Sequence, residues 1–143
     1  MDLVVPSDVQ LIDDLVMKIS SLLSGALCGE ALQTIELALH EALANAILHG
    51  NRSNPATAAR VCLAVREDCR IDVVVKDVGA GFDRDQLPSP GAGENLLASH
   101  GRGIFLMRHL MDEVEFRFQG GTEIRLQRHG TANAEARPAA CAK

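Results

Sequence analysis

The chain has 143 residues, of which 47% are hydrophobic and 23% charged, and this composition is typical of one soluble globular domain with a core of its own. Its formal net charge is −5 and its basic residues are scattered, which argues against direct binding of nucleic acid or of an anionic membrane. There is no Trp or Tyr and there are only 4 Phe, so the core must be aliphatic and few side chains can stack on bases.

Targeting and redox signals are weak along the whole sequence. No apolar run approaches the roughly 20 residues that cross a bilayer, and the N-terminal residues do not show the pattern of a signal peptide. The 4 cysteines have no C-x-x-C spacing. We therefore expect reduced thiols and a cytoplasmic protein.

The first third of the chain predicts a short strand and two helices. Residues 3–5 form a short apolar run that ends at Pro6, and Ser7 with Gln10 has the spacing of a helix capping box. Apolar residues then recur at steps of three and four, which predicts an amphipathic helix. These residues are Val9, Ile12, Val16, Ile19 and Leu23.

The second helix is predicted over residues 30–49 and carries two polar residues on one face. Glu41 and Asn45 lie one turn apart, beside an apolar face, and Gly50 with Asn51 is expected to form a left-handed cap. The apolar face consists of Ile35, Leu39, Ala42, Leu43 and Ala46. On this helix alone, the polar pair would be read as a solvated stripe.

The rest of the chain is predicted to form strands and one more helix. Short β-branched runs cover residues 59–66 and 70–77, with a hairpin turn between them, and alternating runs cover 114–118 and 122–127. Residues 84–100 read as a long mobile loop and are followed by a helix from about residue 100. We expect an α+β fold with one mixed, mostly antiparallel sheet and helices on one face. Residues 1–129 would form a single domain and residues 130–143 a disordered tail.

Four polar or glycine-rich pieces occur in an order that suits nucleotide binding. They are Glu41 with Asn45, Asp77 before Gly79 and Gly81, Gly101 with Gly103, and Gly121 with Thr122. A helix start preceded by glycines exposes N–H groups to phosphate, and a carboxylate at a strand end can accept the amine of adenine. A carboxamide oxygen can hold Mg²⁺, and a nearby carboxylate can act as a base. The P-loop motif and the protein-kinase motifs are absent from the sequence.

In this order the pieces resemble the GHKL ATPase superfamily, over about residues 5–128. The Glu41–Asn45 segment resembles its N box, residues 77–81 its first glycine box and residues 101–103 its second. Within the superfamily, the short chain resembles the bacterial anti-sigma-factor serine kinases. The resemblance implies a two-layer Bergerat fold with three main helices, ATP and Mg²⁺ as cofactors, and two partners: a sigma factor and an anti-anti-sigma protein of the STAS type. A homodimer would also fit the family.

The resemblance also implies roles for individual residues. Glu41 would be the general base, Asn45 the Mg²⁺ ligand, and Asp77 the acceptor of the adenine amine, with Thr122 acting through water. Gly79, Gly81, Gly101 and Gly103 would let the backbone approach the nucleotide, and residues 84–100 would form the ATP lid. His49 would either face the phosphates or pack at the helix end, and Arg102 would either contact phosphate or remain solvated.

Three other readings of the sequence stay open. Residues 84–100 carry only Arg84 as a basic side chain, so an ATP-dependent binding switch without phosphoryl transfer is the main alternative. The catalytic half of a histidine kinase fits poorly, because no His precedes His40 and no room is left for a phosphoacceptor helix pair. A small α+β domain without a nucleotide site would require all four pieces to be coincidental.

Overall fold

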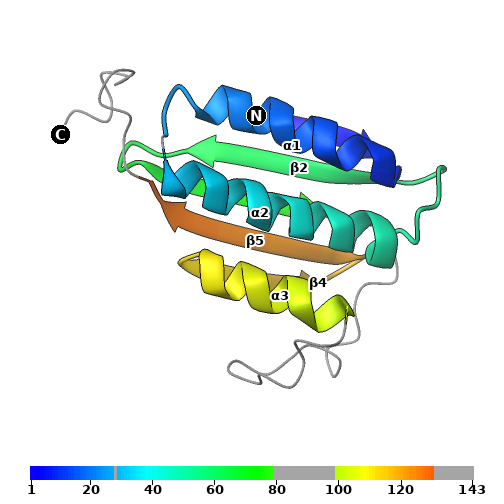
Figure 1. The fold of residues 1–143 in the computed structure, drawn as a ribbon. Helices are drawn as coiled ribbons and strands as arrows, with labels where there is room; N and C mark the ends of the chain where they lie inside the picture. Colours follow the sequence, from blue (N-terminus) through cyan, green and yellow to red (C-terminus); the bar gives the residue numbers. More distant parts are fainter. Residues whose placement is uncertain (28, 79–98, 131–143) are drawn as a thin grey trace.

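The computed structural model describes residues 1–27, 29–78 and 99–130, in which one layer of helices covers one face of a sheet (Figure 1). In chain order the elements are β1 (Asp2–Pro6), the 3₁₀-helix η1 (Val9–Leu11), α1 (Ile12–Leu23), α2 (Glu30–Ala44), the π-helix η2 (Asn45–Gly50), β2 (Ala58–Val65), β3 (Arg70–Lys76), α3 (Ser99–Leu110), β4 (Glu113–Phe118) and β5 (Thr122–His129). The predicted α+β fold with its two layers is confirmed.

The sheet has five strands in the order β1-β2-β3-β5-β4. All four described pairings are antiparallel, so the sheet is more uniform than the mixed sheet that the sequence suggested. The predicted hairpin between β2 and β3 is present, and Cys69 turns it with a φ of 61°. After β5 the chain stays attached, because Gly130 N–H donates to the Cys69 carbonyl over 3.0 Å. The folded part therefore includes Gly130.

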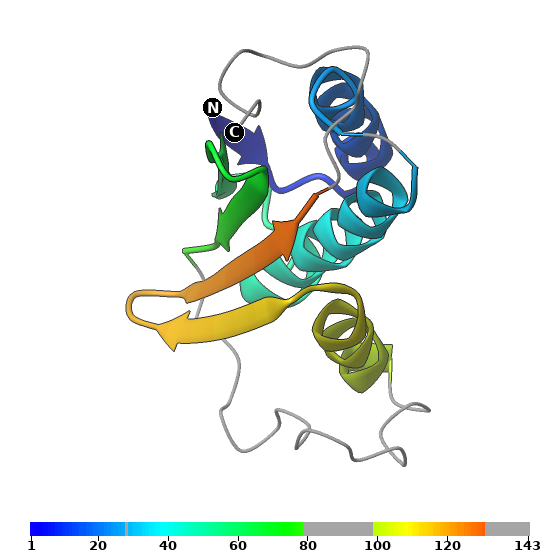
Figure 2. The ribbon, with the colours of Figure 1, turned by 90° about the vertical axis from the view of Figure 1, so that its left-hand side faces the viewer.

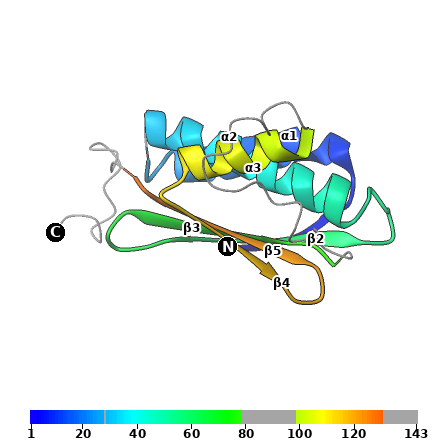
Figure 3. The same cartoon turned by 90° about the horizontal axis from the view of Figure 1, so that it is seen from below.

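The helices α1, α2 and α3 all lie on one side of the sheet, as the end-on views show (Figures 2 and 3). Helix α2 lies between α1 and α3, and it crosses above the middle strands (Figure 1). The central position of α2 brings its two flanks into contact with different neighbours. Glu41, on the flank toward α3, is consequently half-buried instead of fully exposed to water.

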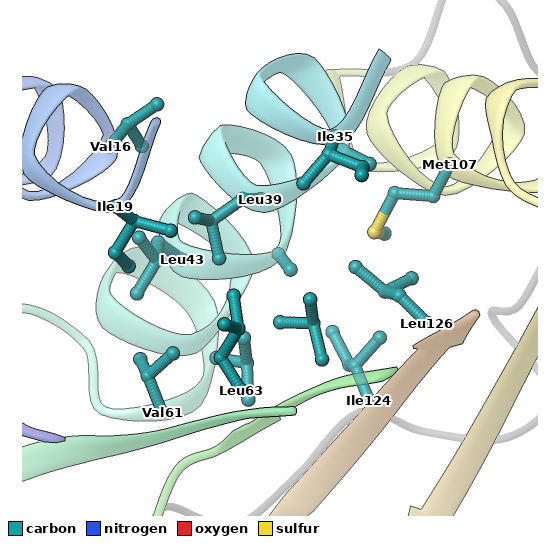
Figure 4. Close-up of a cluster of buried hydrophobic side chains, with 14 of the residues drawn as sticks. Val16, Ile19, Ile35, Leu39, Leu43, Val61, Leu63, Met107, Ile124 and Leu126 are labelled. Atoms are coloured by element: carbon teal, nitrogen blue, oxygen red, sulfur yellow. The ribbon is translucent and has the colours of Figure 1, made fainter. Parts of the chain in front are cut away.

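The core fills the space between α2 and the sheet, and it is aliphatic as predicted (Figure 4). The apolar face predicted for α2 and η2 is buried at every position, from Ile35 to Ala46. Every second residue of the strands packs against this apolar face, since successive side chains of a strand point to opposite faces of the sheet. The largest of these are Val61, Leu63, Ile71, Val73, Val75, Ile124 and Leu126.

The cap at the start of the first helix differs from the prediction. Asp8, and not Ser7, caps it: the Asp8 Oδ1 atom accepts the Gln10 N–H over 2.9 Å. The helical turn begins one residue later than the capping-box spacing implied, so Ser7 is left to point inward and is 3% exposed. Its hydroxyl group is then available for other partners.

Two further expectations can be compared with the described residues. No described helix has both the length and the apolar character that crossing a membrane requires. Cys62 forms no disulfide. Its Sγ–H points at Asp2, and burial raises the pKa of the Cys62 thiol.

The core under α2 should dominate stability, and two leucines of this helix provide the test. Leu43 is 0% exposed, and we expect Leu43→Ala to lower the free energy of unfolding by about 2–5 kcal/mol, because a cavity remains. Leu37 is 51% exposed, and Leu37→Ala should change it by only about 0.5 kcal/mol. Urea denaturation measures both values, and equal losses would contradict the assignment of the buried face.

Candidate functional site

The candidate site begins with the helix formed by α2 and η2, which carries Glu41 and Asn45. The α-helix ends at Ala44 and continues as the π-helix η2, and the Asn51 N–H then donates to the Ala46 carbonyl over 2.8 Å. Glu41 is half-buried, and Asn45 is 4% exposed. The predicted pair therefore does not form a solvated stripe. Short π-helical segments inside helices occur frequently at functional sites.

Helix α3 comes close to the Glu41 side chain at Gly103. A Cβ atom built on Gly103 would lie 2.5 Å from the Glu41 Oε2 atom and 3.4 Å from its Cδ atom. Because real Cβ atoms are not found at 2.5 Å, only glycine allows this approach. The N box and the second glycine box of the sequence are thus adjacent in space, with the carboxylate lying against the α3 backbone.

Asp77 follows β3 directly and is fixed by the first residue of β5. Its N–H donates to the Thr122 carbonyl over 3.0 Å, and its Oδ1 atom accepts the Thr122 N–H over 3.1 Å. Both residues are 1% exposed. Gly121 has a φ of +118°, and a Cβ atom there would lie 2.2 Å from the Asp77 carbonyl oxygen. The two residues that the resemblance assigned to the adenine amine are therefore hydrogen-bonded neighbours, and their roles in binding remain predictions.

The end of the π-helix encloses Asp77 from the other side, and the prediction for this segment was wrong. Gly50 was expected to form a left-handed cap with Asn51, but Asn51 has a φ of −89°, and the residues with positive φ are Arg52 and Ser53. Gly50 is needed for space instead. A Cβ atom built on it would lie 2.0 Å from the Asp77 Oδ2 atom.

The Asn45 side chain has an unused hydrogen-bond donor. Its Nδ2 atom is buried and has no hydrogen-bond partner among the described residues. Leaving such a group unsatisfied costs about 1–3 kcal/mol, so the site favours a ligand with acceptor oxygens, such as a phosphate.

The described residues contain no cluster of three or more His, Cys, Asp or Glu side chains that could hold a metal ion by themselves. The Asn45 carboxamide, as a single protein ligand, suits Mg²⁺ that arrives with phosphates and keeps its waters. The Asn45 carboxamide therefore fits a metal ion that is carried with a nucleotide.

The other predicted site residues lie in η2, in the first turn of α3 or outside the described residues. Arg102 is exposed in the first turn of α3, and His49 is half-buried in η2. Gly101 belongs to the same first turn of α3. Gly79 and Gly81 lie outside the described residues, and so does most of the predicted lid over residues 84–100. Their assigned roles remain predictions.

Two residues of the centre were missed as site residues. Gly50 and Asn51 were interpreted as a helix cap, although Gly50 touches Asp77 and Asn51 accepts the Val78 N–H over 3.0 Å. A glycine after a helix has two common uses, positive φ and close approach, and one sequence does not separate them. The only available signal was their position directly after the polar helix.

Gly50→Ala should disrupt the surroundings of Asp77. The added methyl group would overlap the buried carboxylate, so we expect a loss of several kcal/mol in the free energy of unfolding, or a displaced Asp77. Gly25→Ala is the matched control, since its Cβ atom would meet only the Leu22 carbonyl oxygen, at 3.9 Å. Thermal denaturation of both variants measures this, and a Gly50→Ala protein as stable as Gly25→Ala would contradict the close approach.

Comparison with known proteins agrees with this geometry. The family described as histidine kinase-like ATPase domain matches residues 5–128. An anti-sigma F factor from Heyndrickxia coagulans is 36% identical over 93 residues, which cover 62% of this chain and 63% of that protein. The serine-protein kinase RsbW from Bacillus subtilis (strain 168) is 28% identical over 106 residues, which cover 70% of this chain and 66% of that protein. The chain thus spans slightly less than two thirds of either relative.

A further relative and a solved structure extend the comparison. An anti-sigma F factor from Priestia megaterium is 31% identical over 106 residues, which cover 71% of this chain and 72% of that protein. The histidine kinase domain of the blue-light activated histidine kinase from Erythrobacter litoralis EL346 superposes with a TM-score of 0.54. It covers 70% of this chain and 45% of its own at 22% identity, which supports the fold alone. The chain belongs to the histidine kinase-like ATPase family, the GHKL superfamily, in the group that contains the anti-sigma kinases.

Proposed function

We propose that this protein binds ATP, phosphorylates a serine of an anti-anti-sigma protein of the STAS type, and binds a sigma factor. One observation carries the proposal: a single helix has Glu41 against α3 at one point and Gly50 against Asp77 nine residues later. At 1.5 Å per α-helical residue these points are at most about 13.5 Å apart along the axis. This separation suits an extended nucleotide with its base at Asp77 and its terminal phosphate near Glu41.

The Asp77 end supports selection of the base. Its carboxylate accepts only, so it can take the exocyclic amine of adenine and would repel the carbonyl oxygen that guanine carries at the same position. Because Asp77 is buried and its Oδ1 atom already receives the Thr122 N–H, the orientation of the carboxylate is set before a nucleotide arrives. Such preorganisation lowers the cost of binding.

The Glu41 end supports the chemistry. The N-terminus of α3 places the positive end of its helix dipole at the first turn, which favours phosphate oxygens there. Asn45 would hold Mg²⁺, which neutralises charge on the phosphates when it is bound. Glu41 would accept the proton of the serine hydroxyl while the serine oxygen bonds to the γ-phosphorus, and the bond from that phosphorus to the ADP oxygen breaks.

The names of the relatives support the two proposed partners. Proteins named anti-sigma F factor and serine-protein kinase RsbW are similar to most of the folded chain, and their names describe both activities. We therefore infer a cytoplasmic protein that has two protein partners, a sigma factor and an anti-anti-sigma protein. A homodimer is compatible with the family.

Phosphoryl transfer is tested by the conservative change Glu41→Gln. We expect transfer of label from γ-labelled ATP to the purified anti-anti-sigma partner to fall at least about 100-fold, because the general base is lost. ADP affinity should change by less than about threefold, because Glu41 lies at the phosphate end.

Glu36→Gln on the same helix is the control for this experiment, since Glu36 bonds Ser20 of α1. Its activity should match that of the wild type. Transfer at the wild-type rate in Glu41→Gln would reject the base assignment. Wild-type protein that retains ATP and never labels the partner would instead favour a binding switch without transfer.

Base selection is tested by isothermal titration with ATP, ADP and GTP. Adenine nucleotides should bind and GTP should bind much more weakly. Asp77→Asn should weaken ADP binding about tenfold or more, because a hydrogen bond to a charged acceptor is lost and the new amide group can turn its donor toward the amine. No binding of any nucleotide to the wild type would contradict the proposed function itself.

A further inference from the structure

Asn51 is almost completely buried, and both the oxygen and the nitrogen of its side-chain amide are hydrogen-bonded to other residues. Its exposed fraction is 4%. Its Oδ1 atom accepts the N–H of Val78, the residue after Asp77, over 3.0 Å, and its Nδ2 atom donates to the Ser7 Oγ atom over 2.9 Å. These partners lie 27 and 44 residues away in the sequence. The contacts therefore join three distant parts of the chain.

The orientation of this amide follows from its partners. The Val78 N–H can only donate, so the atom that faces it must be the carbonyl oxygen of Asn51, and Nδ2 must face Ser7. A reversed amide group would place an N–H donor against the backbone N–H donor. The buried network thus has one arrangement.

The direction of the hydrogen bonds beyond Asn51 is also determined. The Thr57 hydroxyl donates its only proton to the Asn54 carbonyl over 2.7 Å, so it must accept from Ser7, whose Oγ atom is 3.0 Å away. Ser7 accordingly accepts from Asn51 and donates to Thr57. The side chain of Asn51 thus donates to Ser7, Ser7 donates to Thr57, and Thr57 donates to the Asn54 carbonyl. This chain of four residues is called the Asn51 relay below.

The Asn51 relay holds the residue that follows Asp77. The Val78 side chain is 61% exposed, so packing does little to fix this residue, and its described backbone hydrogen bond is the one to Asn51. On the other side of the carboxylate, the Asp77 N–H is bonded to Thr122. Asp77 is therefore held from two sides. Its own backbone N–H is bonded to Thr122 of β5, and the backbone N–H of the following residue, Val78, is bonded to Asn51.

The backbone of Asn51 is anchored in turn. Its N–H donates to the Ala46 carbonyl over 2.8 Å, which ties it to the π-helix that presses Gly50 against Asp77. The same segment thus supplies both the space for the carboxylate and the hydrogen bond that fixes the residue after it. A bond to Ser7, at the start of the first helical segment, keeps the amide from rotating away.

We infer that Asn51 is a positioning residue for adenine recognition, which acts through Asp77 and is itself supported by Ser7. This inference rests on the proposed nucleotide site, because its effect is on the choice between bases. Loss of Asn51 frees the Val78 amide and lets the Asp77 carboxylate tilt. A tilted Asp77 carboxylate distinguishes the amine of adenine from the carbonyl oxygen of guanine less well. The difference in affinity between adenine and guanine nucleotides therefore becomes smaller.

The experiment compares ADP and GDP binding by isothermal titration in the wild type and in two variants. Asn51→Ala should reduce the ratio of the two dissociation constants roughly tenfold, since a fixed hydrogen bond to the strand end is removed. Ser7→Ala should reduce the ratio less, because Asn51 keeps its bond to Val78 but loses its support. Where Asn51→Ala does not fold by circular dichroism, Ser7→Ala decides.

Thr34→Ala is the matched control for general loss of stability. Thr34 is 5% exposed, and its hydroxyl donates to the Glu30 carbonyl at the far end of α2, so a buried hydroxyl is removed outside the Asn51 relay. In Thr34→Ala, the ratio of the ADP and GDP dissociation constants should equal that of the wild type. A wild-type preference for ADP that stays unchanged in both variants of the Asn51 relay would overturn this inference alone. Wild-type protein that binds neither nucleotide would overturn the proposed function and this inference with it.

Discussion

The structure depends on bringing backbone directly against two carboxylates. Asp77 is enclosed by Gly50 and Gly121, and Glu41 lies against Gly103, at distances where no Cβ atom could fit. Each approach joins elements that are distant in the sequence: η2 with the end of β3, β5 with the same strand end, and α2 with α3. Gly50 therefore sets how closely η2 can approach the end of β3, Gly121 how closely β5 approaches it, and Gly103 how closely α3 lies to Glu41.

The hydrophobic core explains how these approaches are maintained. Helix α2 buries Leu39, Ala42 and Leu43 almost completely over the middle strands, and this burial prevents the helix from rotating about its axis. With the apolar face directed toward the sheet, Glu41 lies on the flank that faces α3, next to Gly103. A mutation in the core would thus change the site indirectly, because the same helix carries both. Close packing transmits such shifts, since protein interiors leave few voids to absorb them.

The fold was largely predictable from the sequence, whereas the support of the site was not. Apolar periodicity located α1 and α2, and alternation located the strands to within one or two residues, because burial on one face leaves a regular pattern. Asp77 and Thr122 were identified by their places at strand ends. The π-helix, the contact between Gly50 and Asp77, and the inward turn of Ser7 leave no such pattern. They depend on which elements meet in space, and that meeting is a property of the whole fold.

The two carboxylates differ in how firmly the structure holds them, and this difference bears on binding and transfer. Asp77 is 1% exposed and is bonded within a sheet whose strands are paired along their lengths. Glu41 is half-buried, and its close neighbour is a backbone atom of α3, a helix that packs on α2 mainly through side chains such as Met107 (Figure 4). A small displacement of α3 would change the surroundings of Glu41 and leave those of Asp77 intact. The residue proposed to recognise adenine is thus held within the sheet, whereas the surroundings of the group proposed for proton transfer depend on the position of one helix. Under the proposed function, nucleotide binding would therefore tolerate small shifts of α3 better than phosphoryl transfer would.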